Sequence, residues 1–404
     1  MLSRFVRLGS RQFFSTATSP FQPLVVFSEE NEALRESVSR FALERVGPKV
    51  KQMDRDQKLD ESLLKELFDQ GYMGIETPAE LGGAGLNLTS TMVVVEELAK
   101  IDPAVAVVVD VQNTLVNPIV KTFGTDKQKQ EWLPKLATGT LGSFCLSEAS
   151  SGSDAFALKT TAVDKGDHWE LNGSKMWITN SKEAGLFLIF ATVNPAAGYK
   201  GITAFLAGRD TPGLRVGKSE DKLGIRASST CEVIFEGMKL PKDAVLGKVG
   251  EGYKVAIGTL NIGRIGIGAQ MLGLAQGAFD YAMPYLHERK QFGKYIADFQ
   301  GMQLQYAEAA TMIHGARLMV YEAARLHETG RPFVQEAAMA KWNAAQVASH
   351  VSRRAIEWLG GVGFTKEFDA EKFYRDSVIG QIYEGTSNIN LETIAKNIQK
   401  KYRQ

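Results

Sequence analysis

The periodicity of the apolar residues changes twice along this chain, and this change limits the folds open to it. Up to about Gly139, and again beyond Gly250, apolar side chains recur at the 3.6-residue spacing of amphipathic helices. Between these parts, short runs rich in β-branched and aromatic residues predict strands. We therefore predict an α+β fold with an N-terminal helical domain (25–140), a middle antiparallel β-barrel or sandwich domain (141–250) and a C-terminal antiparallel helix bundle (251–404).

Long helices are expected in the C-terminal bundle at residues 253–289, 300–328 and 332–359. Pro332 is expected in the first turn of the last one, where its missing N–H costs nothing. In the N-terminal domain we expect helices at residues 31–46, 63–70, 90–101 and 108–123, with a Pro/Gly loop at 71–86.

The dipeptide Asn172-Gly173 lies between two strand-like runs, 169–171 and 175–179. Both residues tolerate positive φ, so we predict a hairpin turn there. Trp177 and Thr179 are two residues apart, which places them on one face of the second strand. An indole beside a hydroxyl would suit a flat, partly polar heteroaromatic ring. A core tryptophan beside a strand-forming threonine is the alternative.

Near the C-terminus the chain carries one carboxylate on a glycine-bearing bend, in the run Tyr383-Glu384-Gly385-Thr386-Ser387-Asn388. The bend is expected directly ahead of a new helix. A glutamate held by such a stiff turn can be aimed at a single C–H bond, and desolvation would raise its pKa into the range of a useful base. The alternative is a helix-start carboxylate favoured by the helix dipole.

The composition excludes several classes of function. The formal net charge of +1 leaves no general basic field, so a nucleic acid is not expected as the main ligand. No apolar run is expected to reach the roughly 20 residues of a membrane helix.

No histidine follows a glutamate by three residues, so a di-iron helix bundle is not expected, nor is any other metal. No Gly-x-Gly-x-x-Gly follows a strand, which argues against a nicotinamide cofactor. Cys145 and Cys231 are too few for a disulfide framework and fit a reducing compartment.

The first stretch of the chain, residues 1–24, differs from the rest. It contains Arg4, Arg7 and Arg11, several Ser and Thr, and no acidic residue. Its apolar side chains can gather on one helical face with the arginines elsewhere, which is the pattern of a mitochondrial transit peptide. We therefore expect the mature protein in the mitochondrial matrix. A flexible basic tail is the alternative.

Several motifs occur together in an order that resembles acyl-CoA dehydrogenases, and the resemblance extends from Phe27 onward. They are Phe144-Cys145-Leu146-Ser147-Glu148 with Gly152-Ser153-Asp154, Lys175-Met176-Trp177-Ile178-Thr179-Asn180, Gly71-Tyr72-Met73-Gly74-Ile75, Leu223-Gly224-Ile225-Arg226, Arg289-Lys290-Gln291-Phe292-Gly293 and the loop of Glu384. Within the family, Asn261-Ile262-Gly263-Arg264 and the Glu384 loop are most similar to the short/branched-chain-specific branch.

The resemblance implies an FAD cofactor held by two groups of residues. The isoalloxazine and ribityl part would be held by Phe144, Cys145, Leu146, Ser147, Ser153, Trp177, Ile178 and Thr179. The pyrophosphate and adenosine part would be held by Arg289, Gln300, Glu357, Trp358, Leu359, Gly360 and Gly361. In this family part of the second group comes from a neighbouring subunit, which implies a homotetramer. The cofactor site would be closed beside the base by Thr386, Ser387 and Asn388. Many relatives carry Gln at position 357, which leaves the contact of that side chain open.

The resemblance also implies the reaction. Glu384 would remove the α-proton of an acyl-CoA thioester while the β-hydrogen leaves as hydride to FAD, giving a trans-2-enoyl-CoA. The thioester carbonyl would accept hydrogen bonds from the FAD ribityl hydroxyl and the Glu384 N–H. Some relatives carry their base at the position of Gly263, which cannot abstract a proton. The substrate would be contacted by Ser153, Tyr199, Tyr253, Asn261, Ile262, Gly263 and Arg264.

The branch resemblance implies a short branched substrate such as 2-methylbutyryl-CoA, in isoleucine catabolism, with electron-transfer flavoprotein as the electron acceptor. A dehydrogenase of straight short-chain or isobutyryl-CoA is the nearest alternative. A non-catalytic acyl-CoA-binding protein is an alternative from a different functional class. A lack of visible flavin absorbance would indicate this alternative.

Overall fold

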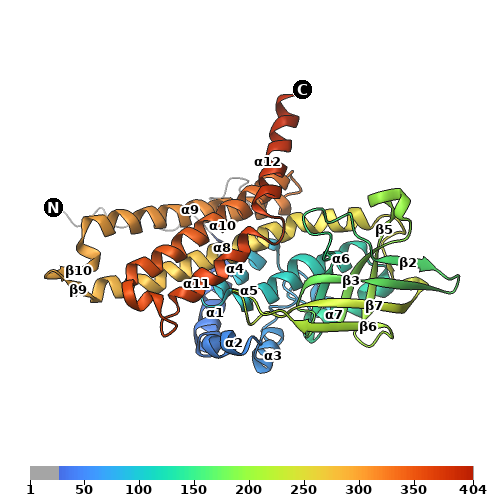
Figure 1. The fold of residues 1–404 in the computed structure, drawn as a ribbon, viewed down its shortest axis with the longest axis horizontal. Coiled ribbons are helices and arrows are strands. Elements are labelled where there is room, and N and C mark those ends of the chain that lie inside the picture. The colour runs from blue at the N-terminus through green and yellow to red at the C-terminus, as the bar shows by residue number, and fades with distance from the viewer. Residues whose placement is uncertain (1–26, 404) are drawn as a thin grey trace, which may run out of the picture.

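The computed structural model describes residues 27–403, and it confirms the α+β fold class, with helices at both ends of the chain and strands between them (Figure 1). The expected transit peptide, residues 1–24, lies outside the described residues. The sheet lies at one end of an elongated molecule, and the long C-terminal helices run away from it (Figure 1).

The N-terminal part is a cluster of short helices, several of which begin at a side-chain cap. Asp60 accepts a hydrogen bond from Leu63 N, and Thr125 and Gln128 form a reciprocal capping box. The helices are α1 (Glu29–Phe41), α2 (Val50–Asp56), α3 (Glu61–Asp69), α4 (Leu88–Ala99), α5 (Pro103–Asp110), α6 (Asn117–Phe123) and α7 (Asp126–Thr138). A π-helical segment, Val111–Val116, joins α5 to α6.

Residues 103–123 correct one expectation from the sequence. This stretch is 21 residues long, with a mean hydropathy of 1.3 in its most apolar window, so its length and composition would allow a membrane helix. Every residue of that window is buried inside the protein. The stretch is therefore a core helix, interrupted by the π-helical turn, and it packs against the sheet and the C-terminal bundle.

The middle part is a mixed sheet, not the purely antiparallel one expected. Within the described residues its order is β6-β7-β3-β2-β4-β5-β8, and β1 pairs with β4. Strand β1 runs parallel to β4, because the chain enters the sheet from α7 rather than from a hairpin. The strands are β1 (Gly142–Cys145), β2 (Thr161–Asp164), β3 (His168–Thr179), β4 (Leu186–Thr192), β5 (Ile202–Gly208), β6 (Leu214–Ser219), β7 (Thr230–Pro241) and β8 (Val245–Leu246).

The predicted hairpin at Asn172-Gly173 is wrong. Strand β3 runs unbroken through both residues, and its register against β7 shifts between Leu171 and Gly173, which marks a β-bulge. A second shift lies between Lys175 and Ile178, where Trp177 has a φ of 65°. Because of this second bulge, simple alternation does not decide the face on which Trp177 lies.

The C-terminal part is the predicted helix bundle, and two of its helices, at residues 252–288 and 300–328, match the sequence interpretation at both ends to within one residue. Its helices are α8 (Gly252–Glu288), α9 (Gln300–Glu328), α10 (Val334–Leu359), α11 (Ala370–Ser377) and α12 (Ser387–Tyr402), with a short hairpin of β9 (Lys290–Gln291) and β10 (Lys294–Tyr295) between α8 and α9. Helix α10 begins two residues after Pro332, so this proline precedes the first turn instead of occupying it. Helix α12 projects from the rest of the molecule (Figure 1).

Helix α8 is the central element of the bundle, and its glycines let other helices approach closely. A β-carbon at Gly273 would lie 2.3 Å from the carbonyl oxygen of Glu96, and one at Gly277 would lie 2.1 Å from that of Lys100. Side chains at these positions would push α4 away from α8. The close approach places the end of α5 beside the middle of α8, where the candidate active site is found.

Candidate active site

Glu384 lies on a bend between two helical segments, as the sequence predicts. A 3₁₀ turn (Val378–Gln381) ends just before it, and α12 begins three residues after it with Thr386 as its N-cap. Glu384 has a φ of 50° and Gly385 a φ of 87°, so two successive residues adopt the left-handed conformation. That conformation costs a non-glycine residue about 1–2 kcal/mol, so the bend needs external contacts to hold it.

Two side chains hold this bend through one oxygen atom. Lys341 Nζ, from α10, donates a hydrogen bond to the Gly385 carbonyl oxygen at 2.6 Å, and Asn390 Nδ2, from α12, donates to the same oxygen at 2.8 Å. Both side chains are buried. The backbone beside the Glu384 carboxyl group is thereby fixed to the core of the bundle.

The Glu384 side chain points at the middle of α8. A β-carbon at Gly263 would lie 2.8 Å from Glu384 Oε2 and 2.9 Å from Leu115 Cδ2. Within the described residues, Oε2 is buried without a hydrogen-bond partner. Burial raises the pKa of Glu384 to about 7, and the cations of Arg264 and Lys341 oppose that rise. A carboxylate with this pKa is suited to accept a proton near neutral pH.

A second buried carboxyl group lies near the first. Asp110, the last residue of α5, points at Gly266, where a β-carbon would lie 1.8 Å from its Oδ1. Among the described residues this oxygen has no hydrogen-bond partner. Burial, followed by the proximity of Glu384, raises the pKa of Asp110 well above its usual range. Both effects favour the neutral, protonated form of Asp110.

The residues expected around the isoalloxazine ring meet where the end of β1 approaches β3. Met176 N donates to the carbonyl oxygen of Ser147, and Ser143 Oγ donates to that of Thr179, which joins the two segments. The Trp177 side chain is 58% exposed although the bulge constrains its backbone. A large aromatic surface held in the open beside Ser147 and Thr179 fits a planar ring such as a flavin, and it is not the core tryptophan of the alternative interpretation.

A buried ion pair supports this part of the sheet. Lys175, on β3, is fully buried and donates hydrogen bonds to Glu148 Oε1 at 2.7 Å and to the Leu146 carbonyl oxygen at 3.0 Å. The Glu148 carboxylate also accepts from the backbone N–H groups of Lys159 and Thr160. This pair fixes the segment that follows β1, in which Leu146 and Ser147 lie.

The core helix 103–123 connects the two halves of the site. Gln112 Oε1 accepts a hydrogen bond from Gly142 N, at the start of β1, and Asn180 Nδ2 donates to the Val108 carbonyl oxygen near the end of β3. From the same helix, Leu115 and Asp110 reach toward Gly263 and Gly266 of α8. The expected ring-binding strands and the Glu384 carboxyl group thus border one rigid helix.

The residues expected to contact the substrate lie along the first turns of α8 and beside them. The ring of Tyr253 lies 4.7 Å from that of Tyr199 and 4.5 Å from that of Phe156, so these aromatics form a cluster at the start of the helix. Further along α8, Arg264 Nη1 donates to Asn261 Oδ1 at 3.0 Å. Ile262 is half-buried next to them, and Ser153 is exposed on the loop after β1.

The second group of expected FAD residues is not brought to the first group within one chain. Arg289 follows the far end of α8, about 55 Å of helix from its start. Trp358 Nε1 donates to Gln305 Oε1, which joins the end of α10 to the beginning of α9, where Gln300 lies. The β9–β10 hairpin, which lies between Arg289 and Gln300 in the chain, is at the opposite end of the molecule from the sheet (Figure 1). Leu359, Gly360 and Gly361 follow Trp358 at the end of α10. The Glu357 carboxylate is paired with Arg354 at 2.7 Å, and the Trp358 and Leu359 side chains are buried.

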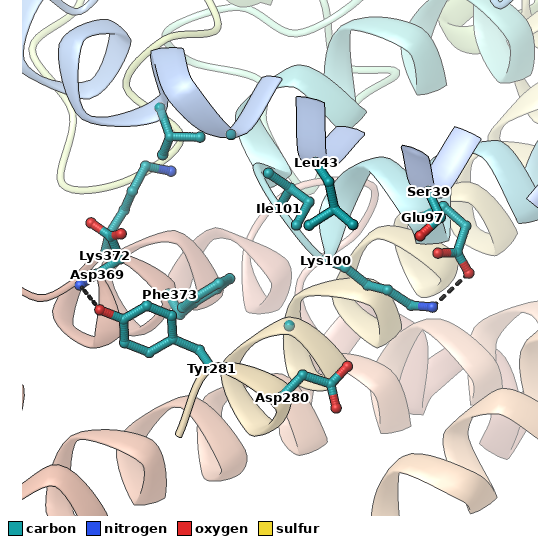
Figure 2. A pocket seen from close by; sticks show the side chains of 13 residues that line it. Ser39, Leu43, Glu97, Lys100, Ile101, Asp280, Tyr281, Asp369, Lys372 and Phe373 are labelled. Carbon is teal, nitrogen blue, oxygen red and sulfur yellow. Dashed lines mark hydrogen bonds and ion pairs between the residues drawn. The ribbon is translucent and has the colours of Figure 1, made fainter. Parts of the chain in front are cut away.

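A cavity of about 410 Å³ lies elsewhere in the molecule, between the N-terminal helices and the bundle. Figure 2 shows the side chains that line it. It is lined by Leu43 and Ile101 on one side and by Tyr281 and Phe373 on the other. The buried Lys372 beside it is paired with Asp102 at 2.9 Å and Asp376 at 2.6 Å. None of the expected site residues lines this cavity, so it is separate from the candidate active site.

Sequence reasoning missed Lys341, Asp110 and Asn390. The first two are single charged residues within apolar helical stretches: Lys341 follows a run of alanines, and Asp110 follows Val107-Val108-Val109. The sequence signal that could have identified these two residues is a charged side chain on an otherwise apolar helix face. Asn390 lies near the start of α12, and its local sequence does not distinguish this buried asparagine from one on the surface.

Family models match almost all of the described chain. The acyl-CoA dehydrogenase N-terminal domain matches residues 28–140, the middle domain residues 143–238 and the C-terminal domain residues 250–399.

Individual relatives match over nearly their whole length. A mitochondrial short/branched chain specific acyl-CoA dehydrogenase of Rattus norvegicus is 55% identical, over 95% of this chain and 88% of the relative. A probable short/branched chain specific acyl-CoA dehydrogenase of Dictyostelium discoideum is 56% identical, over 98% and 96%. Among solved structures, butyryl-CoA dehydrogenase from Megasphaera elsdenii is 36% identical with a TM-score of 0.91, covering 92% of this chain and 99% of that one. A glutaryl-CoA dehydrogenase from Mycobacterium smegmatis, in complex with FADH2, is 29% identical with a TM-score of 0.88, covering 93% and 95%.

Proposed function

The chain belongs to the acyl-CoA dehydrogenase family and is an FAD-dependent oxidoreductase of acyl-CoA thioesters, and from that premise we propose that Glu384 is the base that removes the α-proton of a short branched acyl-CoA. The observation that supports this role is the placement of the Glu384 carboxyl group against Gly263, with Oε2 buried and unpaired. An oxygen without a hydrogen-bond partner is free to accept a substrate proton.

The residues of the chain have separable tasks in this proposal. Glu384 accepts the α-proton, and burial keeps its pKa near 7 so that a fraction large enough for catalysis is ionised at neutral pH. Arg264 and Lys341 place positive charge near the Glu384 carboxyl group, which favours its ionised form. When bound, FAD supplies the acceptor for the β-hydrogen, which leaves as hydride to give a trans-2-enoyl-CoA.

We propose that the first FAD group, from Phe144 to Ser147 with Ser153 and the run 177–179, holds the isoalloxazine and ribityl part. The exposed, bulge-held indole of Trp177 supports this assignment. The backbone after Glu384, at residues 386–388, would close the cofactor site. The cluster of Tyr199 and Tyr253, with residues 261–264, would hold the acyl-CoA.

We propose a homotetramer in which the second FAD group acts on the cofactor of a neighbouring subunit. The position of Arg289 just beyond the end of α8, a helix about 55 Å long whose first turns carry expected substrate residues, supports this arrangement. Light scattering should give the mass of four chains. The three-domain division at residues 140 and 250 and electron-transfer flavoprotein as electron acceptor are further parts of the proposal, supported by the family resemblance.

The protein is mitochondrial: the rat relative carries this location in its name, and residues 1–24 have the composition of a transit peptide. We propose the matrix as its compartment. For the substrate we propose 2-methylbutyryl-CoA, in isoleucine catabolism, supported by the naming of the relatives as short/branched chain specific.

The experiment is anaerobic reduction of the bound flavin by a substrate panel. The purified protein should be yellow and should be bleached fastest by 2-methylbutyryl-CoA, more slowly by isobutyryl- and butyryl-CoA, and least by isovaleryl-CoA. A preference for butyryl-CoA or isobutyryl-CoA would contradict the substrate assignment. A colourless protein, or one that no acyl-CoA bleaches, would contradict the proposed function as a whole.

A further inference from the structure

We propose that Lys341 is a positioning residue of the proton-transfer site: its ammonium group anchors the Gly385 carbonyl and also keeps the neighbouring Glu384 carboxyl group in its ionised, proton-accepting form. This inference rests on the proposed role of Glu384 as the base. In this proposal the buried Lys341 determines both the conformation of the bend and the pH range in which Glu384 can accept a proton.

The burial of Lys341 shows that the fold has a specific use for it. The residue is fully buried in α10 among alanines that are themselves buried, including Ala340 and Ala344. A charged group in such surroundings is costly unless it is paired and hydrogen-bonded. The α8 helix passes directly over it, since a β-carbon at Gly268 would lie 3.6 Å from Lys341 N. The ammonium group is therefore directed at the Gly385 carbonyl, 2.6 Å away.

Lys341 ties the strained bend to α10, and the Tyr383 hydroxyl beside the bend donates a hydrogen bond to Gln270 Oε1 on α8. Asn390 also donates to the Gly385 oxygen, at 2.8 Å, but it lies only five residues further along the same chain segment. Its hydrogen bond shapes the start of α12 without fixing that start to the bundle. Lys341 comes from 44 residues away in sequence, so it fixes the position of the bend that carries Glu384 relative to α10.

The charges around Glu384 make the electrostatic part of the role possible. Arg264 faces it from α8, Lys341 from α10 and Asp110 from α5, and Tyr383 adjoins it in the loop. The pKa of Asp110 and that of Tyr383 are both raised well above their usual ranges, mainly by burial, which favours the neutral form of each group. The two cations are thus the charges that act on the carboxylate.

The pKa values of Lys341 and Glu384 lie in the order that the proposal requires. Burial lowers the pKa of Lys341 to about 8, and the presence of Glu384 limits that decrease. Burial raises the pKa of Glu384 to about 7. Between these values the lysine is a cation while the glutamate is an anion, which is the charge pattern that the proposal needs.

The test compares variants that separate the charge of Lys341 from its hydrogen bond. Lys341→Met removes both, Lys341→Gln keeps a neutral donor, and Lys341→Arg keeps a cation. Asn390→Ala is the matched control, because it removes the other donor to the same oxygen and changes no charge. For each variant, FAD content, thermal unfolding and kcat/KM between about pH 5.5 and 9 are measured.

Loss of the cation should raise the pKa of Glu384, because the positive charge favours the ionised carboxylate. The acid limb of kcat/KM should therefore move upward by roughly one pH unit in Lys341→Met and Lys341→Gln. In Asn390→Ala the rate should fall while the limb stays in place, and Lys341→Arg should restore the wild-type limb. Lys341→Met should also lose about 100-fold in kcat through misplacement of the base, and Lys341→Gln should lose less.

An acid limb that is unchanged in Lys341→Gln, or in Lys341→Met if that variant folds, would overturn the inference. Glu384→Gln separates this failure from failure of the proposed function. If Glu384→Gln is inactive while the acid limb of kcat/KM is unchanged in the lysine variants, only the role proposed for Lys341 is wrong. If Glu384→Gln turns over normally, the function proposed for Glu384 itself is wrong.

Discussion

The α-carbon of Gly263 faces the carboxyl group of Glu384 so closely that a β-carbon at position 263 would lie 2.8 Å from Oε2 and 3.2 Å from Cδ. Because the same β-carbon would also lie 2.9 Å from Leu115 Cδ2, it could not be accommodated by a small rotation of one neighbour. The absence of a side chain at this position of α8 is what leaves room for a carboxylate to reach the site from the C-terminal loop.

Gly263→Ala should therefore displace Glu384 and reduce kcat by about 100-fold, since a shift of about 1 Å in a reacting group has an effect of that order. FAD content should stay at the wild-type level, because the atoms nearest to a β-carbon at Gly263 belong to Glu384 and Leu115 and not to the β1 and β3 segments. Gly258→Ala is the control on the same helix: its β-carbon would meet Phe123 Cζ at 3.7 Å, an ordinary contact. Equal activity of the two variants would contradict the assignment.

Lys175→Met should destabilise the sheet and release FAD. The substitution leaves the Glu148 carboxylate buried without its cation, and loss of one partner of a buried pair costs about 3–5 kcal/mol. Thermal unfolding and the ratio of flavin to protein measure both effects. Lys65→Met, in the exposed pair with Asp69, should change stability by less than about 1 kcal/mol. Full retention of FAD by Lys175→Met would show that the pair does not support the cofactor site.

The raised pKa of Glu384 has a consequence for stability. The folded protein binds this proton with a pKa of about 7, compared with 4.5 for an ordinary glutamate in water. The unfolded state therefore loses the proton first, and the contribution of Glu384 to the free energy of unfolding falls as the pH rises from about 4.5 to about 7, then stays constant. Glu384→Gln cannot titrate in this way. Its melting temperature should exceed that of the wild type by an amount that grows across this range, and a difference independent of pH would contradict the burial of the carboxyl group.

Local sequence patterns predicted those elements whose structure is determined locally. The boundaries of α8 and α9 follow from long amphipathic runs bounded by Gly and polar residues, and the Glu384 bend follows from its adjoining glycine. Asn172-Gly173 misled the interpretation because its turn chemistry is local, whereas the structure there is decided by pairing with β7 across the sheet. A dipeptide that accepts positive φ serves a bulge as well as a hairpin.

The polar groups around Glu384 could not be predicted for a different reason. The partner of Lys341 lies 44 residues away, and Asp110 meets α8 through Gly266, more than 150 residues further along the chain. Such contacts depend on how helices pack, and a single charge on an apolar helix face does not identify its partner. The candidate base was predictable because its own loop carries the signal, but its surroundings required the fold.

The most direct test of the account is the rate at which acyl-CoA reduces the flavin of Glu384→Gln in the absence of oxygen. The amide has nearly the same shape as the carboxyl group but cannot accept the α-proton. The account predicts a yellow protein that binds 2-methylbutyryl-CoA and is bleached at least about 100-fold more slowly than the wild type. Bleaching at the wild-type rate would show that another group removes the proton and would contradict the account.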